Sequence, residues 1–377
     1  MNPWFVNPPR ALGEPLFAAT IRQHCADFEV TEIMPLEFDG AGEHLYLRIE
    51  KSDINTYTVV ELLQNAYDLN SADIGFSGLK DRRAVCSQWF SVCTPESESV
   101  AEKAFAELSA AGGNGQLRLL DAHRHQRKLR RGTHDANRFS IVLRDLRFDG
   151  ATQADLDARI RQVSQIGFPN YLGPQRFGVQ HRNIHLALQW FRKRKRASRK
   201  QRSLWLSAAR SALFNHIGAA RVADGSWNQL LEGEPVMLDG SRSFFSPEPA
   251  MSASADFSQR LACFDIHPSA AWWGRGESLA SADCAELEAR VLSEHAELCA
   301  GLEQAGLKQE RRALRARAAN LQHQWLNKTT LNLEFQLQPG VFATSLLREL
   351  GTFVEPTSQR NGASAMPAEE AMRKIEG

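Results

Sequence analysis

The stretch GFSGLKDRRAVCSQW, from Gly75 to Trp89, joins a glycine-containing turn to a segment rich in strand-forming residues. Its centre places one carboxylate, Asp81, beside three cations, Lys80, Arg82 and Arg83. Cations within about 4–6 Å favour the charged form of a carboxyl group, so a carboxylate in this turn is expected to be ionised. Two interpretations stay open at this point: an aspartate of a turn or surface ion pair, or a nucleophile.

Strands are predicted on both sides of this turn, because apolar and polar residues alternate there. The segments are 28–33 (FEVTEI), 43–51 (EHLYLRIEK), 137–146 (NRFSIVLRDL) and 331–340 (LNLEFQLQPG). Residues 55–70 switch to helical spacing, with Asn55 or Thr56 as a suitable N-cap. The two periodicities together predict the α/β (α+β) class.

A turn-rich break at 167–178, GFPNYLGPQRFG, separates this strand-rich sequence from a mainly helical one. Helices are predicted over 204–222 and 283–301, the second with Asp283 and Glu286 as a capping box and Gly301 just past its end. The simplest architecture is a discontinuous α/β domain with a second domain inserted in it. The predicted ranges are 1–166 and 313–355 for the first domain, 167–312 for the insert, and 356–377 for a polar, mobile tail.

The bulk composition is that of an ordinary globular chain, with 377 residues, 43% hydrophobic and 24% charged. No run of eighteen apolar residues and no signal-peptide pattern is present, so a cytoplasmic protein without membrane contact is expected. The six cysteines form no CxxC pair, and the Walker A and GxGxxG patterns are missing. The sequence therefore predicts no metal and no cofactor. A monomer is expected, because no coiled-coil pattern is present.

The net charge of +1 hides two strongly basic runs, at 124–138 (RHQRKLRRGTHDANR) and 192–202 (RKRKRASRKQR). Basic segments on a nearly neutral protein indicate a polyanionic partner bound to one face. The alternative is a pair of solvated helix or loop faces. Two such runs near aromatic-rich strands favour RNA or DNA.

In addition, the chain resembles one known family along nearly its whole length, up to about Phe353. The resemblance is to the TruD family of tRNA pseudouridine synthases. It rests on motifs that occur in this order: DFEVTEI, GEHLYLRIEK, GFSGLKDRRAVCSQWFSV, KLRRG followed by NRFSIVLRD, PNYLGPQRFG, SAARSALFNHIGAAR, GLKQERRALR and FATSLLREL.

The resemblance implies a pseudouridine-synthase catalytic domain with a mixed, mainly antiparallel sheet and an inserted, mostly helical TRUD domain. The implied activity is isomerisation of uridine-13 in the D-arm of tRNA, with Asp81 as the catalytic residue. The reaction breaks one bond and makes another without oxidation, so no cofactor is implied. One departure is Ala136, where the family commonly has glycine.

The family motifs also suggest a site for a flipped-out uridine. Phe28, Phe139 and Phe342 are expected to form its apolar walls, and Asn137 to read the uracil edge. Without the resemblance, Phe28 and Phe139 on alternating strands are core residues and Asn137 is a turn residue. The basic candidates are Lys80 and Arg348 near Asp81, and, for the RNA backbone, Lys128, Arg130, Arg131, Arg192, Lys193 and Arg194.

Asp81 is expected to be ionised yet shielded from water. The sequence leaves its basic partner open, as well as its route, by attack on the base or on the sugar. The alternative function is a non-catalytic RNA-binding or chaperone protein with the same fold. The intact GLKDR turn favours the enzyme, because an inert relative could have lost Asp81.

Overall fold

The computed structural model describes residues 7–110, 115–193, 196–252 and 254–356. Its largest sheet has ten strands, in the order β15-β16-β7-β2-β5-β3-β6, with β1, β17 and β4 paired beside this path. The strands are β1 (Phe17–Ile21), β2 (Phe28–Ile33), β3 (His44–Ser52), β4 (Ile74–Phe76), β5 (Val85–Cys93), β6 (Gln116–His125), β7 (Ala136–Phe148), β15 (Ala319–Asn327), β16 (Thr330–Leu337) and β17 (Thr352–Val354).

The pairings β2–β5 and β1–β17 are parallel, and the other pairings of this sheet are antiparallel. The predicted α/β class and the mixed, mainly antiparallel sheet are therefore confirmed. Ala136 begins β7 and pairs with Ile33 in extended backbone. Because any residue adopts that conformation, alanine fits at this position without strain.

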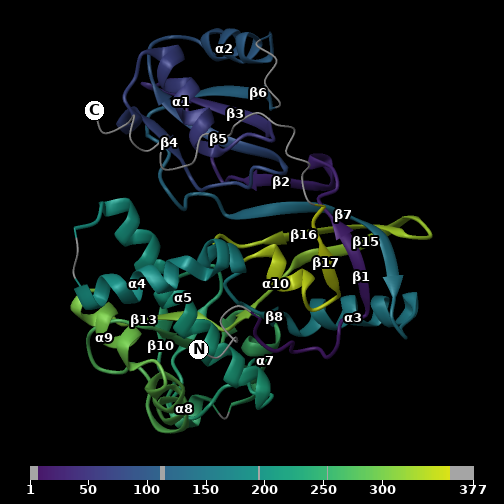
Figure 1. Ribbon diagram of the computed structural model, residues 1–377, viewed down its shortest axis with the longest axis vertical. Helices are drawn as coiled ribbons and strands as arrows, with labels where there is room; N and C mark the ends of the chain where they lie inside the picture. Colours follow the sequence, from purple (N-terminus) through teal and green to yellow (C-terminus); the bar gives the residue numbers. More distant parts are fainter. Residues whose placement is uncertain (1–6, 111–114, 194–195, 253, 357–377) are drawn as a thin grey trace.

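Two helices cover one face of strands β3 and β5, at one end of the molecule (Figure 1). These are α1 (Thr56–Tyr67), which follows Asn55 as predicted, and α2 (Ser99–Ala110). Leu45, Leu47 and Ile49 of β3 are buried against them. A second, smaller cluster around Tyr46 and Trp89 covers the opposite face. On this opposite face of β3, Tyr46 is buried because large aromatic side chains cover it, whereas Arg48 and Glu50 are partly exposed.

The central sheet has its own core, in which β7 lies between β2 and β16. The apolar faces predicted over 137–146 and 331–340 meet in register, with Phe139 opposite Phe335 and Ile141 opposite Leu333. Helices α3 (Gln153–Ile166) and α10 (Ala343–Leu347) pack on this core.

The chain leaves this sheet and returns to it at adjacent points. Strand β8 (Phe168–Pro169) pairs with β14 (Arg315–Ala316). Between them lies a region with a separate core, seen at the opposite end of the molecule from α1 and α2 (Figure 1). Its main helices are α4 (Arg182–Lys193), α5 (Arg199–Ala223), α8 (Ala282–Ser293) and α9 (Ala296–Gln304).

This inserted region also contains short strands that the sequence did not predict, β9 (Val236–Leu238), β10 (Phe244–Phe245), β11 (Ile266–His267), β12 (Ser269–Trp272) and β13 (Glu310–Ala313). Short helices complete the described elements: α6 (Pro249–Ser252), α7 (Ala255–Ala262), η2 (Cys25–Asp27), η3 (Ser71–Asp73), η4 (Pro174–Phe177) and η5 (Val179–His181). The predicted mobile tail lies outside the described residues beyond Pro356.

The prediction of one helix over 283–301 is wrong. Helix α8 begins after Ser281 as N-cap, and α9 is a separate helix after His295. Gly301 lies inside α9, where a Cβ atom would be 2.2 Å from Cδ2 of Phe191. The glycine is required by the close packing of α9 on α4 and does not terminate a helix.

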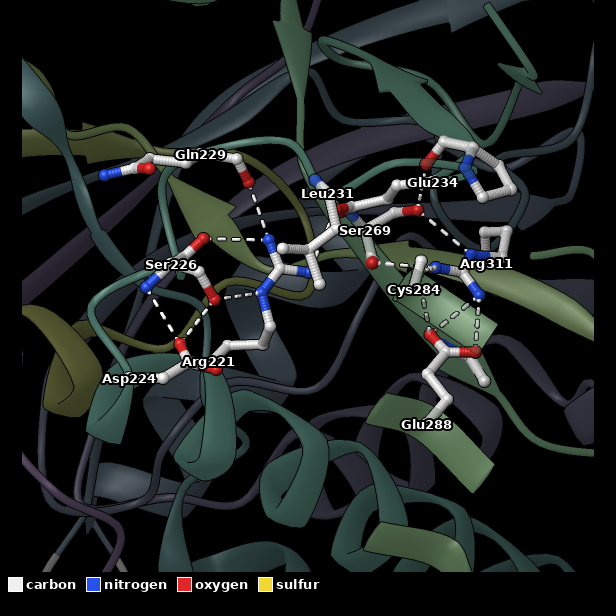
Figure 2. A network of polar contacts seen from close by, with 12 residues as sticks. Arg221, Asp224, Ser226, Gln229, Leu231, Glu234, Ser269, Cys284, Glu288 and Arg311 are labelled. Atoms are coloured by element: carbon white, nitrogen blue, oxygen red, sulfur yellow. Dashed lines mark hydrogen bonds and ion pairs between the residues drawn. The ribbon is translucent and has the colours of Figure 1, made fainter. Parts of the chain in front are cut away.

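A buried polar network joins four segments of the inserted region (Figure 2). Arg221 of α5 pairs with Glu234 at 2.9 Å, and Arg311 of β13 pairs with Glu288 of α8 at 2.8 Å. Ser269 connects the two pairs, because its N–H donates to Glu234 and its carbonyl accepts from Arg311. Each charged group here has a partner, which is what burial of charges demands.

Candidate active site

The turn that carries Asp81 is fixed from below by buried polar groups. Lys51 of β3 is fully buried, and its Nζ donates to the carbonyl of Asp81 at 2.6 Å and to that of Ile54 at 2.8 Å. Thr56 Oγ1 accepts from the N–H of Lys80 at 3.0 Å. Burial lowers the pKa of Lys51, against the charge of Asp81, which raises it. The backbone of the turn is therefore held in one position.

The carboxylate of Asp81 pairs with Arg22, at 2.8 Å between Oδ2 and Nη2. Arg22 directly follows β1, has a φ of 56°, and lies with its Cζ 4.0 Å from the ring centroid of Phe28. Its other Nη atom binds Glu355 at 2.6 Å. Arg22 is 59 residues from Asp81 and in no motif of charged residues, so sequence reasoning missed it.

The sequence left the partner of Asp81 open, and none of the four basic candidates forms its ion pair in this structure. Arg82 pairs with Asp53 at 2.9 Å, Arg83 donates to the carbonyl of Arg22 at 3.1 Å, and Lys80 turns inward to Glu32. Arg348 binds the carbonyl of Pro9 and Oε1 of Glu349 and lies over Tyr171. Neighbours in a turn point apart, and α10 directs Arg348 toward the N-terminal segment.

The expected shielding of Asp81 is wrong for the free protein. Its side chain is 54% exposed, whereas that of Arg22 is 16% exposed. The guanidinium group covers the aromatic ring beneath it, and the carboxylate reaches outward from the pair. The carboxylate is thus accessible to a macromolecular substrate.

The predicted wall residues Phe28 and Phe139 are both buried core residues. Their rings meet edge to face with centroids 6.0 Å apart, and Phe139 stacks on Phe335 at 5.2 Å. Phe28 is linked to Asp81 through Arg22, so these aromatics form the floor beneath the ion pair. Their burial agrees with the interpretation of Phe28 and Phe139 as core residues, and the contact of Phe28 with Arg22 places them next to the site as well.

Asn137 is the second residue of β7. It pairs with Glu32 of β2 on one side and with Leu337 of β16 on the other. Its Nδ2 is 3.2 Å from Nε2 of His134, and its Oδ1 is buried without a partner. His134 itself lies near Glu32, the ion-pair partner of Lys80. The structure therefore brings Lys80 and Asn137 into one cluster through Glu32 and His134, two residues that were not among the predicted site residues.

Phe342 is the N-cap residue of α10 and is half-buried. It follows the turn after β16, whose last residue Leu337 pairs with Asn137. Two arginines approach this turn: Arg176 lies with its Cζ 5.7 Å from the Phe342 ring centroid, and Arg312 donates to the carbonyl of Gly340 at 2.9 Å. Neither has a carboxylate partner among the described residues.

The cations predicted to contact the RNA backbone differ in their exposure and in whether they already have a partner in the protein. Arg130 and Lys193 are exposed, and Arg131 lies over the ring of Phe76 at 3.7 Å. Lys128 is half-buried and donates to the carbonyl of Ala72, and Arg192 forms a two-bond pair with Glu297. Arg194 lies outside the described residues. Charge density along the sequence did not reveal which cations were already paired.

No helix within the described residues is long and apolar enough to span a membrane. The cysteine nearest the turn, Cys86, is buried, which raises its pKa to about 11. Its sulfur is therefore a neutral thiol at physiological pH and a poor nucleophile.

Comparisons with known proteins agree on one family. The sequence profile described as tRNA pseudouridine synthase D (TruD) matches residues 11–195 and 189–350. A protein named tRNA pseudouridine synthase D from Xanthomonas campestris is 43% identical over 361 residues, which cover 92% of this chain and 95% of the relative. One of the same name from Pseudomonas putida is 43% identical over 343 residues, covering 91% and 94%.

A solved structure of a Methanosarcina mazei protein, described as TruD, has the same fold. It superposes with a TM-score of 0.68 at 20% identity, over 94% of this chain and 97% of that chain. The profile covers nearly all of the described residues, and the sequence relatives cover both the sheet and the inserted region. The chain belongs to the TruD family of tRNA pseudouridine synthases.

Proposed function

We propose that this protein isomerises uridine to pseudouridine in tRNA, at uridine-13 of the D-arm, with Asp81 as the catalytic carboxylate. The observation that carries the proposal is the Arg22–Asp81 pair, 2.8 Å long, on a turn fixed by buried Lys51. A turn held this firmly while its carboxylate faces outward suits a group that must meet a substrate in one orientation.

The chemistry requires little beyond such a group. The N1–C1′ bond breaks, the uracil turns, and a C5–C1′ bond forms; the proton leaves C5 and N1 gains one. A carboxylate can attack covalently or stabilise positive charge at C1′. Arg22 orients the carboxylate through Oδ2, and the second oxygen, Oδ1, has no ion-pair partner among the residues that the structure describes.

The substrate itself supplies the shielding in this proposal. A uridine stacked within a folded tRNA is inaccessible, so it has to be flipped toward Asp81. The RNA then covers the exposed side of the ion pair, above the floor formed by Phe28 and Phe139. Asn137 reads the uracil edge, and Phe342, which follows the strand paired with Asn137, is proposed as a further wall.

Backbone contacts come from the exposed cations. Arg130 and Arg131 lie in the loop before β7, the strand of Asn137, and are proposed to contact phosphates next to the flipped nucleotide. Lys193 belongs to the inserted region and contacts a more distant part of the tRNA. Such contacts supply affinity and salt dependence and carry no base identity.

The decisive experiment compares Asp81→Asn with Asp53→Asn. Both residues are exposed or half-exposed aspartates paired with an arginine near the same turn, but only Asp81 is placed in the chemistry. Release of tritium from C5-labelled tRNA should fall at least about 10³-fold in Asp81→Asn and little in Asp53→Asn. Binding of tRNA should be kept in both, because the basic surface is unchanged.

The site of modification is tested with tRNA in which uridine-13 is replaced by cytidine. Loss of tritium release from that substrate supports position 13 as the target, and unchanged release would place the target elsewhere. The second candidate, a non-catalytic RNA-binding protein, is favoured only if the unmodified chain binds tRNA but forms no pseudouridine.

A further inference from the structure

A buried carboxylate lies beneath the catalytic turn and takes no part in the mechanism described above. Glu32, near the end of β2, has a fully buried side chain. It accepts hydrogen bonds from Nζ of Lys80 at 2.8 Å, from the N–H of Trp89 at 3.0 Å and from Oγ of Ser77. An ammonium group and two further donors therefore surround the carboxylate of Glu32.

His134 lies between this carboxylate and Asn137. Its Nδ1 is 4.0 Å from Oε1 of Glu32, and its Nε2 is 3.2 Å from Nδ2 of Asn137. An amide nitrogen only donates, so Nε2 must be the acceptor and Nδ1 must carry the proton. That proton faces the carboxylate. The reverse tautomer would turn the Nδ1 lone pair toward Glu32, which Coulomb repulsion opposes.

Burial, more than the charges nearby, favours the neutral form of His134. Burial and the nearby ammonium of Lys80 lower its pKa, against Glu32 and Asp135, which raise it. A neutral imidazole with the proton on Nδ1 offers one acceptor to Asn137. A doubly protonated ring would offer none, and the amide of Asn137 would have to turn over.

The contact with His134 determines what the oxygen of the Asn137 amide can bind. With Nδ2 committed to His134, Oδ1 of Asn137 is buried and has no partner. An unsatisfied acceptor in a buried position is destabilising unless a ligand donates to it. Uracil carries an N–H at ring position 3, whereas cytosine carries a bare nitrogen there. An amide with Oδ1 free pairs with the first and repels the second.

We propose that His134, oriented by Glu32, is a specificity-determining positioning residue: it fixes the amide of Asn137 so that the site accepts a base with an imide N–H and rejects cytosine. The inference rests on the proposed function, because it assumes that Asn137 reads the flipped base. It adds to that function a chain of contacts, Lys80–Glu32–His134–Asn137, which ties the base reader to the turn of Asp81.

The test measures discrimination separately from catalysis. In an Asp81→Asn background, dissociation constants are measured for two full-length tRNAs that differ only in uridine or cytidine at position 13. The parent should prefer uridine by about tenfold. His134→Ala should bring this ratio close to one. His134→Gln should keep most of it, because its Oε1 can accept from Asn137 in place of Nε2.

Two further variants control for folding and local charge. Glu32→Gln should lower the ratio while leaving the ring in place, because a neutral amide no longer selects the tautomer. Asp135→Asn removes an exposed neighbouring charge that has no contact with Asn137 and should keep the ratio. Circular dichroism and melting temperature identify a variant that is unfolded, in which case the remaining substitutions decide.

The results separate two failures. If folded His134→Ala or Glu32→Gln discriminates as well as its parent, the inference is overturned, whatever the activity. If the chain with Asp81 intact forms no pseudouridine in tRNA, the proposed function fails. A collapsed ratio in both variants, retained in His134→Gln and Asp135→Asn, supports the inference.

Discussion

The arginine–carboxylate pairs of the two ends of this protein differ in what surrounds them. In the inserted region, Arg221 pairs with Glu234, and its remaining nitrogen donors bind Ser226 and Gln229. At the turn of Asp81, Arg22 shields one side of the carboxylate and leaves more than half of its side chain exposed. The Arg221–Glu234 pair is fully satisfied inside the fold, whereas the carboxylate proposed to meet a substrate remains accessible.

The buried arginine pairs of the inserted region join segments that are far apart in the chain. Arg311–Glu288 connects β13 to α8, and Ser269 of β12 links Arg311 to Glu234, the partner of Arg221 in α5. The sheet has continuous ladders and apolar cores on its faces. Substitutions in the two regions should therefore affect different properties, which the following predictions test.

The largest expected effect is on stability, from Glu288→Ala. Removal of this carboxylate leaves the guanidinium of Arg311 buried without a counter-charge, so the free energy of unfolding should fall by about 3–5 kcal/mol. Urea denaturation followed by circular dichroism measures it. The matched control is Glu297→Ala, which breaks an exposed pair with Arg192 on the neighbouring helix and should change little. Equal effects of the two would show that burial does not set the contribution of these ion pairs to stability.

The next effect is on activity, from Arg22→Met. Methionine can still cover the ring of Phe28 but cannot orient Asp81, so tritium release should slow by about 10²-fold with stability almost unchanged. Arg82→Met, which breaks the pair with Asp53, is the control and should stay active. A stability loss in Arg22→Met as large as that of Glu288→Ala would show that the Arg22–Asp81 pair is structural.

A third prediction concerns pH. Burial, with the neighbouring His295, lowers the pKa of His216 in the inserted region to about 4. A histidine whose pKa is lower in the folded than in the unfolded state binds its proton more readily when unfolded. Stability should therefore fall as pH decreases from about 6.5 toward 4. Thermal melting across this range measures the loss, and His216→Gln should show a flatter profile. An equally steep profile in that variant would assign the acid sensitivity to other groups.

The smallest effect is expected from the basic run of α4. Because Arg192 is already paired with Glu297, Arg192→Ala together with Lys193→Ala should reduce the salt dependence of tRNA binding by only about one phosphate contact. Glu297→Gln should have the opposite effect, since it frees Arg192. Dissociation constants across a range of salt concentrations give both slopes. No change in either variant would make this run a solvated face.

Much of the fold could be predicted, because its strands and its first helix carry a strong local periodicity. The strands over 137–146 and 331–340 were predicted from alternation alone, and they pair with each other in the sheet. The short strands of the inserted region were missed, since two to four residues carry no periodicity. The prediction of one helix over 283–301 was wrong in part because it placed the end of that helix at Gly301. The glycine lies inside α9 and is explained by its packing against the ring of Phe191, which is distant in sequence.

The residues of the candidate site likewise fall into those that could be predicted from the sequence and those that could not. Asp81, Asn137 and the phenylalanines could be named because they lie in recognisable motifs. The partner of Asp81 could not, since Arg22, Lys80, Arg82, Arg83 and Arg348 are equivalent by charge. Glu32 and His134 were not named either, because an acidic residue on a strand and a histidine in a loop normally face solvent.

The sequence alone therefore determined the long strands of the sheet, the first helix and the turn that carries Asp81, all of which depend on residues close together in the chain. The tertiary structure decided which charges meet: Arg22 with Asp81, Lys80 with Glu32, Arg192 with Glu297. The physical reason is that periodicity acts over a few residues, whereas an ion pair depends on the distance and burial of two side chains that only the folded chain brings together.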